Sequence, residues 1–120
     1  MKSEKVIAVD EQSFRAEVLE ADRPVLVDVG ARWCPPCRAL EPIVAAIAAE
    51  FEDRLKVVAL DSDASPALCA RYGIRANPTL ILIHRGQEIT RHVGFMNRQR
   101  VIALFAEHLE PKAAPRSLSA

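Results

Sequence analysis

Residues 25–40 read VLVDVGARWCPPCRAL, and this stretch decides the fold. Its first five residues are apolar and rich in β-branched side chains apart from Asp28, which is the composition of a buried strand. Cys34 and Cys37 follow, and the two prolines between them suit the first turn of a helix, where their missing N–H groups have no intrahelical partner. The stretch therefore predicts a buried strand that leads directly into a helix, with two cysteines at the junction.

The position of the cysteine pair predicts thiol–disulfide exchange. The two residues lie one helical turn apart, so their sulfurs can meet in a small disulfide ring. A helix N-terminus carries a partial positive charge and unpaired N–H groups, and both favour the Cys34 thiolate over the thiol. We expect Cys34, at the exposed tip, to be the attacking nucleophile, and Cys37, one turn inside, to be the resolving thiol that expels the product from a mixed disulfide.

The residues around the pair modify this chemistry. Arg32 and Arg38 flank the cysteines and would stabilise a thiolate further if they lie close to it. Pro35 and Pro36 remove two N–H donors near the sulfur, which leaves the N–H of Cys37 as the expected donor. The same prolines stiffen the loop, so less entropy is lost when the disulfide ring closes.

Two other interpretations of the pair stay open, half of a zinc site and a chance pair of inert core cysteines. Zinc usually takes four ligands, and the other candidate ligands in the sequence are scattered without ligand-like spacing. They are Cys69, His84, His92 and His108. We therefore expect no metal. Trp33 and the prolines suit an accessible turn better than a core. Cys69 itself is expected to be a buried small hydrophobe rather than a regulatory thiol.

The rest of the chain alternates between strand and helix patterns. Besides the strand at 25–29 and a helix from 35 to 51, we expect helices over 14–22, 66–73 and 101–109, and strands over 55–60, 79–83 and 88–93. This order predicts the α/β class, a central mixed sheet with a parallel core, an antiparallel edge hairpin and helices on both faces. The domain would span 1–109, followed by a flexible C-terminal tail at 110–120 that has two prolines and no periodicity.

Composition excludes several classes of partner. Lys plus Arg and Asp plus Glu both number 16, and a formal net charge of zero gives no long-range attraction to nucleic acid or to an anionic membrane. The apolar run at 6–9 is too short for a signal-peptide core, and no stretch is long enough to cross a bilayer. Three cysteines, an odd number, are unlike a disulfide-stapled secreted scaffold. We therefore expect a cytoplasmic protein, and a monomer.

Several further segments resemble the thioredoxin family, in the order in which that family has them. Together they run from about Val25 to Leu109, most of the chain, and a series of motifs in the right order is more specific than any one of them. They are Val27-Asp28, Ala31, residues 33–38, Pro42, residues 72–75, residues 77–79 and Val93-Gly94. The resemblance implies the thioredoxin fold and a protein-disulfide reductase whose active site includes Trp33, Pro35, Pro36 and Pro78 beside the two cysteines.

The resemblance also implies which residues bind the substrate. Pro78 matches the cis-proline that lies beside the cysteine pair in the family, and Asn77 before it would offer its backbone to an extended substrate. Trp33 matches the tryptophan that packs over the disulfide. Gly94 matches the glycine that leaves room for a docking partner.

Asp28 matches the buried family carboxylate that lies behind the resolving cysteine. Its apolar neighbours in the strand support this independently, because a buried, unpaired carboxyl group has a raised pKa and can take a proton near neutral pH. Asp28 is therefore the expected proton acceptor for Cys37, through water. The alternative is a structural aspartate that is hydrogen-bonded at the end of a strand.

The sequence departs from the family pattern at four positions. Pro35 replaces a glycine, Gly30 an aromatic residue, Ala59 a lysine that is commonly paired with the buried carboxylate, and Asn77 an apolar residue. Gly30 and Ala59 together predict that the surroundings of Asp28 are less tightly packed and that less positive charge lies near its carboxyl group.

These observations predict an enzyme that reduces disulfides in other proteins and holds no cofactor, since the chain has no dinucleotide-binding glycine fingerprint. Electrons would come from NADPH through a thioredoxin-reductase-like flavoprotein. Two alternatives stay open. One is a chaperone-like binding module in which the cysteines are secondary, and the other is a specialised reductase or disulfide isomerase with a dedicated client.

Overall fold

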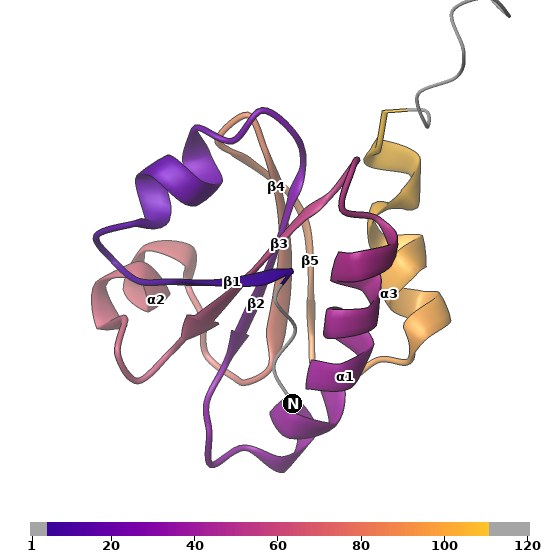
Figure 1. Cartoon of the computed structure of the whole chain (residues 1–120). Helices are drawn as coiled ribbons and strands as arrows, with labels where there is room; N and C mark the ends of the chain where they lie inside the picture. Colours follow the sequence, from indigo (N-terminus) through magenta and orange to yellow (C-terminus); the bar gives the residue numbers. More distant parts are fainter. Residues whose placement is uncertain (1–4, 111–120) are drawn as a thin grey trace, which may run out of the picture.

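The computed structural model describes residues 5–110 (Figure 1). Its elements, in chain order, are β1 (Val6–Val9), η1 (Arg15–Leu19), β2 (Val25–Gly30), α1 (Pro35–Glu50), β3 (Lys56–Asp61), α2 (Pro66–Tyr72), β4 (Thr79–His84), β5 (Gln87–Val93), α3 (Arg98–Phe105) and η2 (Ala106–His108). Residues 111–120, which make up nearly all of the predicted C-terminal tail, lie outside the described residues.

The strands form one mixed sheet in the order β1-β3-β2-β4-β5. β1, β3 and β2 run parallel, whereas β4 pairs antiparallel with both β2 and β5. The predicted mixed sheet is confirmed, but its antiparallel part also includes the β2–β4 pairing. The segment between β3 and β4, which contains the seven-residue helix α2, returns the chain to the same end of the sheet. β4 therefore begins at the end where β2 and β3 finish, with Thr79 opposite Val29.

The sequence analysis missed β1. The run Val6–Val9 pairs in parallel with β3, from Val6 opposite Val57 to Val9 opposite Leu60. It is a four-residue edge strand, mostly exposed, with only Val9 buried. Its sequence, VIAV, has no alternation of apolar and polar residues that would predict a half-buried strand. Pairing with β3 decides its conformation.

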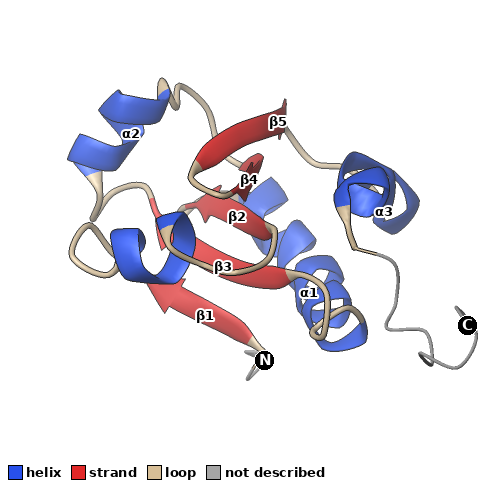
Figure 2. Ribbon diagram, turned by 90° about the horizontal axis from the view of Figure 1, so that it is seen from above, coloured by secondary structure: helices blue, strands red, loops and turns tan. Residues whose placement is uncertain are grey.

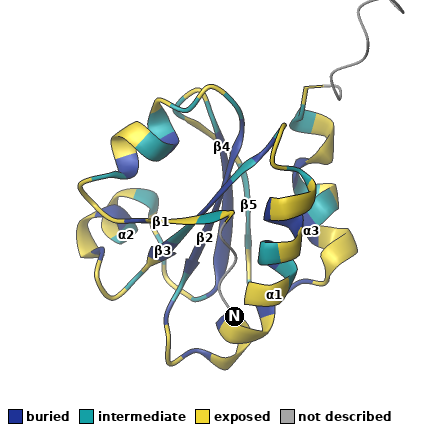
Figure 3. Cartoon of the chain, viewed as in Figure 1, coloured by how far each residue is buried: buried dark blue, intermediate teal, exposed yellow. Residues whose placement is uncertain are grey.

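The apolar core has two halves, one on each face of the sheet, as the predicted two-sided helix cover requires (Figures 2 and 3). Side chains alternate between the faces along each strand. On β2, Leu26 faces α1 and α3, whereas Val25 and Val27 face η1 and α2. β2 and β4 are buried on both faces, which explains their nearly continuous apolar sequences.

Phe105 should carry a large share of the stability on the α1–α3 side. It is 0% exposed, and its ring packs edge-on against that of Phe51, with the centroids 5.2 Å apart. We predict that Phe105→Ala lowers the free energy of unfolding in urea by about 3–5 kcal/mol, because a buried ring is replaced by a cavity. Phe95→Ala, at a phenylalanine that is 47% exposed, should change it by less than about 0.5 kcal/mol. Equal losses in the two variants would contradict this assignment of the core.

Candidate active site at the cysteine pair

The cysteine pair lies at the N-terminus of α1, directly after the central strand β2. Cys34 is the N-cap residue, in an extended conformation, and Cys37 is in the first helical turn. The two form a disulfide with their Cα atoms 5.2 Å apart. The backbone N–H of Cys37 donates a hydrogen bond to the Cys34 sulfur at 3.3 Å, which confirms the predicted donor. The prolines occupy the first two helical positions, where no N–H is needed.

The expectation that Cys34 is exposed at the tip is wrong for the disulfide-bonded state. Cys34 is 3% and Cys37 5% exposed, and both pack with Ala31. The reason is that the bond to Cys37 holds the Cys34 sulfur against the first helical turn. The exposed surface at this point belongs instead to Trp33, which is 66% exposed, and to the two prolines.

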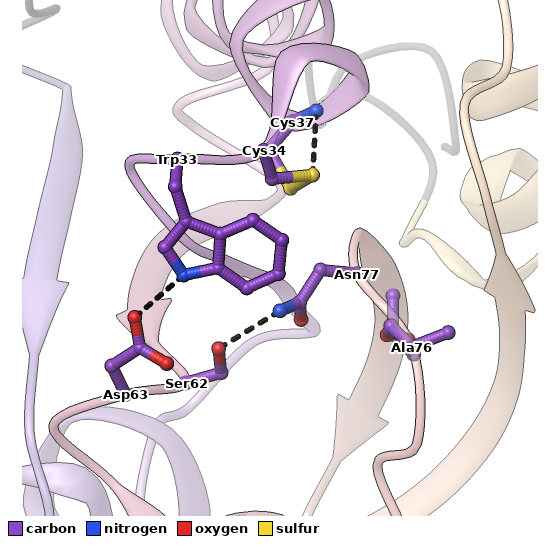
Figure 4. The surroundings of a disulfide bond; sticks show 8 residues. Trp33, Cys34, Cys37, Ser62, Asp63, Ala76 and Asn77 are labelled. Carbon is purple, nitrogen blue, oxygen red and sulfur yellow. Dashed lines mark hydrogen bonds between the residues drawn. A yellow bond between two sulfur atoms is a disulfide. The ribbon is translucent and has the colours of Figure 1, made fainter.

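The indole of Trp33 lies beside the disulfide and is fixed there by a hydrogen bond (Figure 4). Its Nε1–H donates to Oδ2 of Asp63 at 2.8 Å. Asp63 is in the loop after β3, and its own N–H donates to Oδ1 of Asp61 at 2.9 Å. The sequence analysis missed Asp63, because a single polar residue in a loop carries no periodic signal.

The loop before β4 comes to the same edge of the sheet. The Asn77–Pro78 peptide bond is cis, as the resemblance implied. The Asn77 Nδ2 group donates to the Ser62 hydroxyl at 2.9 Å, and Figure 4 shows this carboxamide beside the indole of Trp33. Gly94 has a φ of +101°, its N–H donates to the Pro78 carbonyl at 2.8 Å, and a Cβ on it would meet nothing within 4 Å. Asn77, Pro78 and Gly94 are thus brought together.

Asp28 is a buried side chain on β2, opposite Ala59 in the sheet register. No hydrogen bond joins its carboxyl group to the rest of residues 5–110. It lines a cavity of about 360 Å³ whose walls also include Gly30, Cys37, Glu41 and Ala59. The less tight packing that Gly30 and Ala59 predict is therefore seen as open space beside Asp28.

Burial raises the pKa of the Asp28 carboxyl group to about 7, and the negative charge of Glu41 adds to the rise. This confirms the prediction of a carboxyl that titrates near neutral pH. The sequence analysis missed Glu41, although its position gave a signal. Residues four apart on a helix share a face, so Glu41 had to lie on the same side of α1 as Cys37.

Gly30 permits the close approach of β2 to the resolving cysteine. A Cβ at this position would lie 3.3 Å from the Cys37 sulfur and 3.4 Å from its Cβ, which is tighter than ordinary van der Waals contact. A side chain here would therefore have to displace Cys37 slightly.

The other candidate ligands do not join this site. Across residues 5–110, no group of three or more His, Cys, Asp and Glu side chains could hold a metal ion. Cys69 is a free, half-buried cysteine on α2, 3.7 Å from the Ser62 carbonyl, and burial raises the pKa of its thiol. No helix in the described part of the chain is long and apolar enough to cross a membrane.

A mixed sheet that presents a disulfide at the start of a helix, with a cis-proline loop beside it, defines the class of thiol–disulfide oxidoreductases. The Thioredoxin family model matches residues 5–107. Thioredoxin 1 of Nostoc sp. is 40% identical over 101 residues, which are 84% of this chain and 94% of the relative. The chain therefore belongs to the thioredoxin family, and it is a disulfide reductase that works by dithiol/disulfide exchange through Cys34 and Cys37.

Two further relatives also match this chain over most of its length. Thioredoxin of Porphyra purpurea is 45% identical over 89 residues, which are 74% of this chain and 83% of the relative. Thioredoxin M-type, chloroplastic, of Chlamydomonas reinhardtii is 38% identical over 102 residues, 85% of this chain and 73% of the relative.

Asp28 should make the oxidised protein less stable as the pH rises. The folded state keeps the Asp28 proton up to about pH 7, whereas the unfolded chain loses it near the ordinary aspartate pKa of 3.8. The folded state therefore binds the extra proton between these values, and the free energy of unfolding falls across this window by on the order of 4 kcal/mol. We predict that Asp28→Asn abolishes this fall, so that the variant is the more stable protein at pH 8.5.

Urea unfolding of the oxidised proteins at pH 5 and pH 8.5 measures the part of this fall that lies above pH 5, on the order of 3 kcal/mol. Asp22→Asn, at an exposed aspartate, is the matched control and should keep the wild-type fall in stability. Equal falls in wild type and Asp28→Asn would show that the carboxyl at Asp28 is ionised throughout the range.

Pro35 should weaken the Cys34 thiolate by withholding an N–H at the first helical position. We predict that Pro35→Gly shifts the titration of the thiolate absorbance to lower pH, by on the order of half a pH unit for one added donor. The measurement is made in a Cys37→Ser, Cys69→Ser background, in which Cys34 is the only thiol. An unchanged or higher midpoint would contradict this account.

Proposed function

We propose that the protein reduces disulfide bonds in other proteins, with Cys34 as the nucleophile and Cys37 as the resolving cysteine. The Cys34 thiolate attacks one sulfur of the client disulfide, forms a mixed disulfide and releases the first client thiolate. Cys37, as a thiolate, then attacks the Cys34 sulfur and releases the second client thiolate. Two electrons pass to the client, and the Cys34–Cys37 disulfide remains.

The observation that carries this proposal is the geometry at the start of α1. The Cys34 sulfur accepts the Cys37 N–H at 3.3 Å, at a helix end where the helix dipole favours negative charge. Because Cys37 is already within bonding distance, the second step needs no movement of the strand or the helix.

Asp28 is proposed as the proton acceptor for Cys37 in the second step. Both side chains line the same cavity of about 360 Å³, which has room for water between them. A carboxyl group with a pKa of about 7 is partly ionised at neutral pH and has an affinity for protons suited to the task.

Clients are proposed to bind across the face formed by Trp33, Asn77, Pro78 and Gly94. The indole is fixed beside the disulfide, and the open space at Gly94 admits an approaching chain. Val93 and Phe95 extend this face with exposed apolar surface, of the kind that marks an interaction site. The backbone at Asn77 would pair with an extended client segment.

The remaining proposals concern the environment of the reaction. The protein would act as a monomer without a bound cofactor, and a thioredoxin-reductase-like flavoprotein would return electrons from NADPH to its disulfide. A cytoplasmic location is proposed because a free thiol at Cys69 fits a reducing compartment. Neither nucleic acid nor a membrane is a proposed partner, since the net charge is zero.

Insulin reduction tests the proposed function. With dithiothreitol, or with NADPH and a thioredoxin reductase, the wild-type protein should accelerate precipitation of the insulin B chain many-fold over the reductant alone. Cys34→Ser should abolish the acceleration, and Cys37→Ser should accumulate a mixed disulfide with insulin, because its resolving thiol is missing.

Cys69→Ser is the matched control, because it removes the third thiol at a residue outside the pair, and its rate of insulin reduction should match that of the wild type. A Cys34→Ser, Cys37→Ser double variant that retains full cellular function would show instead that the protein is mainly a binding module.

A further inference from the structure

Three residues with carboxyl groups line the cavity beside the disulfide: Asp28, Glu41 and Asp61. Asp28 comes from the central strand β2 and is buried, and Glu41 comes from α1 and is exposed to solvent. Glu41 lies one turn after Cys37, so the helix holds it on the same side as the resolving sulfur. At about 30 Å³ for each water molecule in the liquid, the cavity of about 360 Å³ has room for several waters.

The cavity exists because the positions opposite Asp28 carry little or no side chain. These positions are Ala59, its neighbour on β3, and Gly30, two residues further along β2. Its neighbour on β4, Leu80, is apolar and does not line the cavity. β1 contributes only apolar side chains to the wall, from Val6, Ala8 and Val9. The strands around Asp28 therefore bring no cationic side chain to it.

The charged residues that line the cavity besides Asp28 are Arg32, Glu41 and Asp61. Arg32 is exposed in the loop after β2. Asp61 ends β3 and accepts the N–H of Asp63 on Oδ1, so it takes part in the local turn. Glu41 is the neighbour whose charge acts on Asp28.

We propose that Glu41 is a positioning residue for the proton transfer at the cysteine pair: its carboxylate, held by α1 across the cavity water, keeps Asp28 a strong acceptor for the Cys37 proton. This inference rests on the proposed function of Cys37 and Asp28. A second negative charge facing Asp28 disfavours its ionised form, and a carboxylate that binds protons more strongly is a better base. The proton passes from the Cys37 thiol through water to Asp28, while the Cys37 sulfur bonds to Cys34 and the client thiolate leaves.

The experiment compares Glu41→Gln with Glu50→Gln in the full chain. Both substitutions remove one negative charge from α1, but Glu50 is paired with Arg98 and does not line the cavity. In carbon NMR of the oxidised protein, Glu41→Gln should move the Asp28 carboxyl titration to lower pH by on the order of half a unit. Glu50→Gln should leave it in place, and Glu41→Asp should restore most of the wild-type position.

Kinetics supply a second readout. The pH profile of insulin reduction with Glu41→Gln should shift in the same direction as the NMR titration, and the rate above pH 8 should fall about twofold, since a weaker base accepts the proton. Urea unfolding midpoints at pH 5 should match that of the wild type, as for a surface substitution.

The outcomes separate the two proposals. If the Asp28 titration does not move in Glu41→Gln, or moves equally in Glu50→Gln, the role of Glu41 is wrong whatever the activity. If wild type fails to reduce insulin, the proposed function is wrong, and the NMR titration still reports whether Glu41 acts on Asp28.

Discussion

The hydrogen bond from the Cys37 N–H to the Cys34 sulfur is the interaction on which the site depends, and the central strand makes it possible. β2 is held on one side by β3 and on the other by β4, and it is buried on both faces. The helix that follows therefore starts at a fixed point. Because Cys34 caps that helix, its sulfur meets the Cys37 N–H, the first N–H that the two prolines leave in this turn, without any adjustment of the chain.

The strand directions explain why distant segments meet at this point. β3 runs parallel to β2, so the loop after it, with Ser62 and Asp63, emerges at the same edge. β4 runs antiparallel, so the loop before it, with Asn77, reaches that edge as well. The hydrogen bonds from Trp33 to Asp63 and from Asn77 to Ser62 then join three loops around the disulfide. A rigid sheet edge thus supplies the preorganisation that exchange between thiols requires.

Sequence reasoning succeeded where the signal was local or periodic. The start of α1, the Cys37 donor and the titration of Asp28 near neutral pH all follow from neighbours in the chain or from apolar surroundings. It failed where pairing across the molecule decides the outcome. β1 is strand-like only beside β3, and Asp63 acquires a role only when β3 brings it to the indole. The burial of Cys34 likewise depends on packing that spacing does not encode.

The environment of Asp28 lowers the stability of the folded state with an ionised carboxyl group, and it raises the affinity of that carboxyl group for protons. A cation at position 59, directly opposite in the register, would compensate the buried charge and stabilise the ionised fold. The same cation would also weaken the carboxylate as a base, because it favours the ionised form. With alanine at 59 and a second carboxylate on α1, no such cation lies opposite Asp28, and its buried carboxyl group keeps a high affinity for protons. The open cavity beside Gly30 acts in the opposite direction, because water that enters it would solvate the ionised form of the carboxyl group.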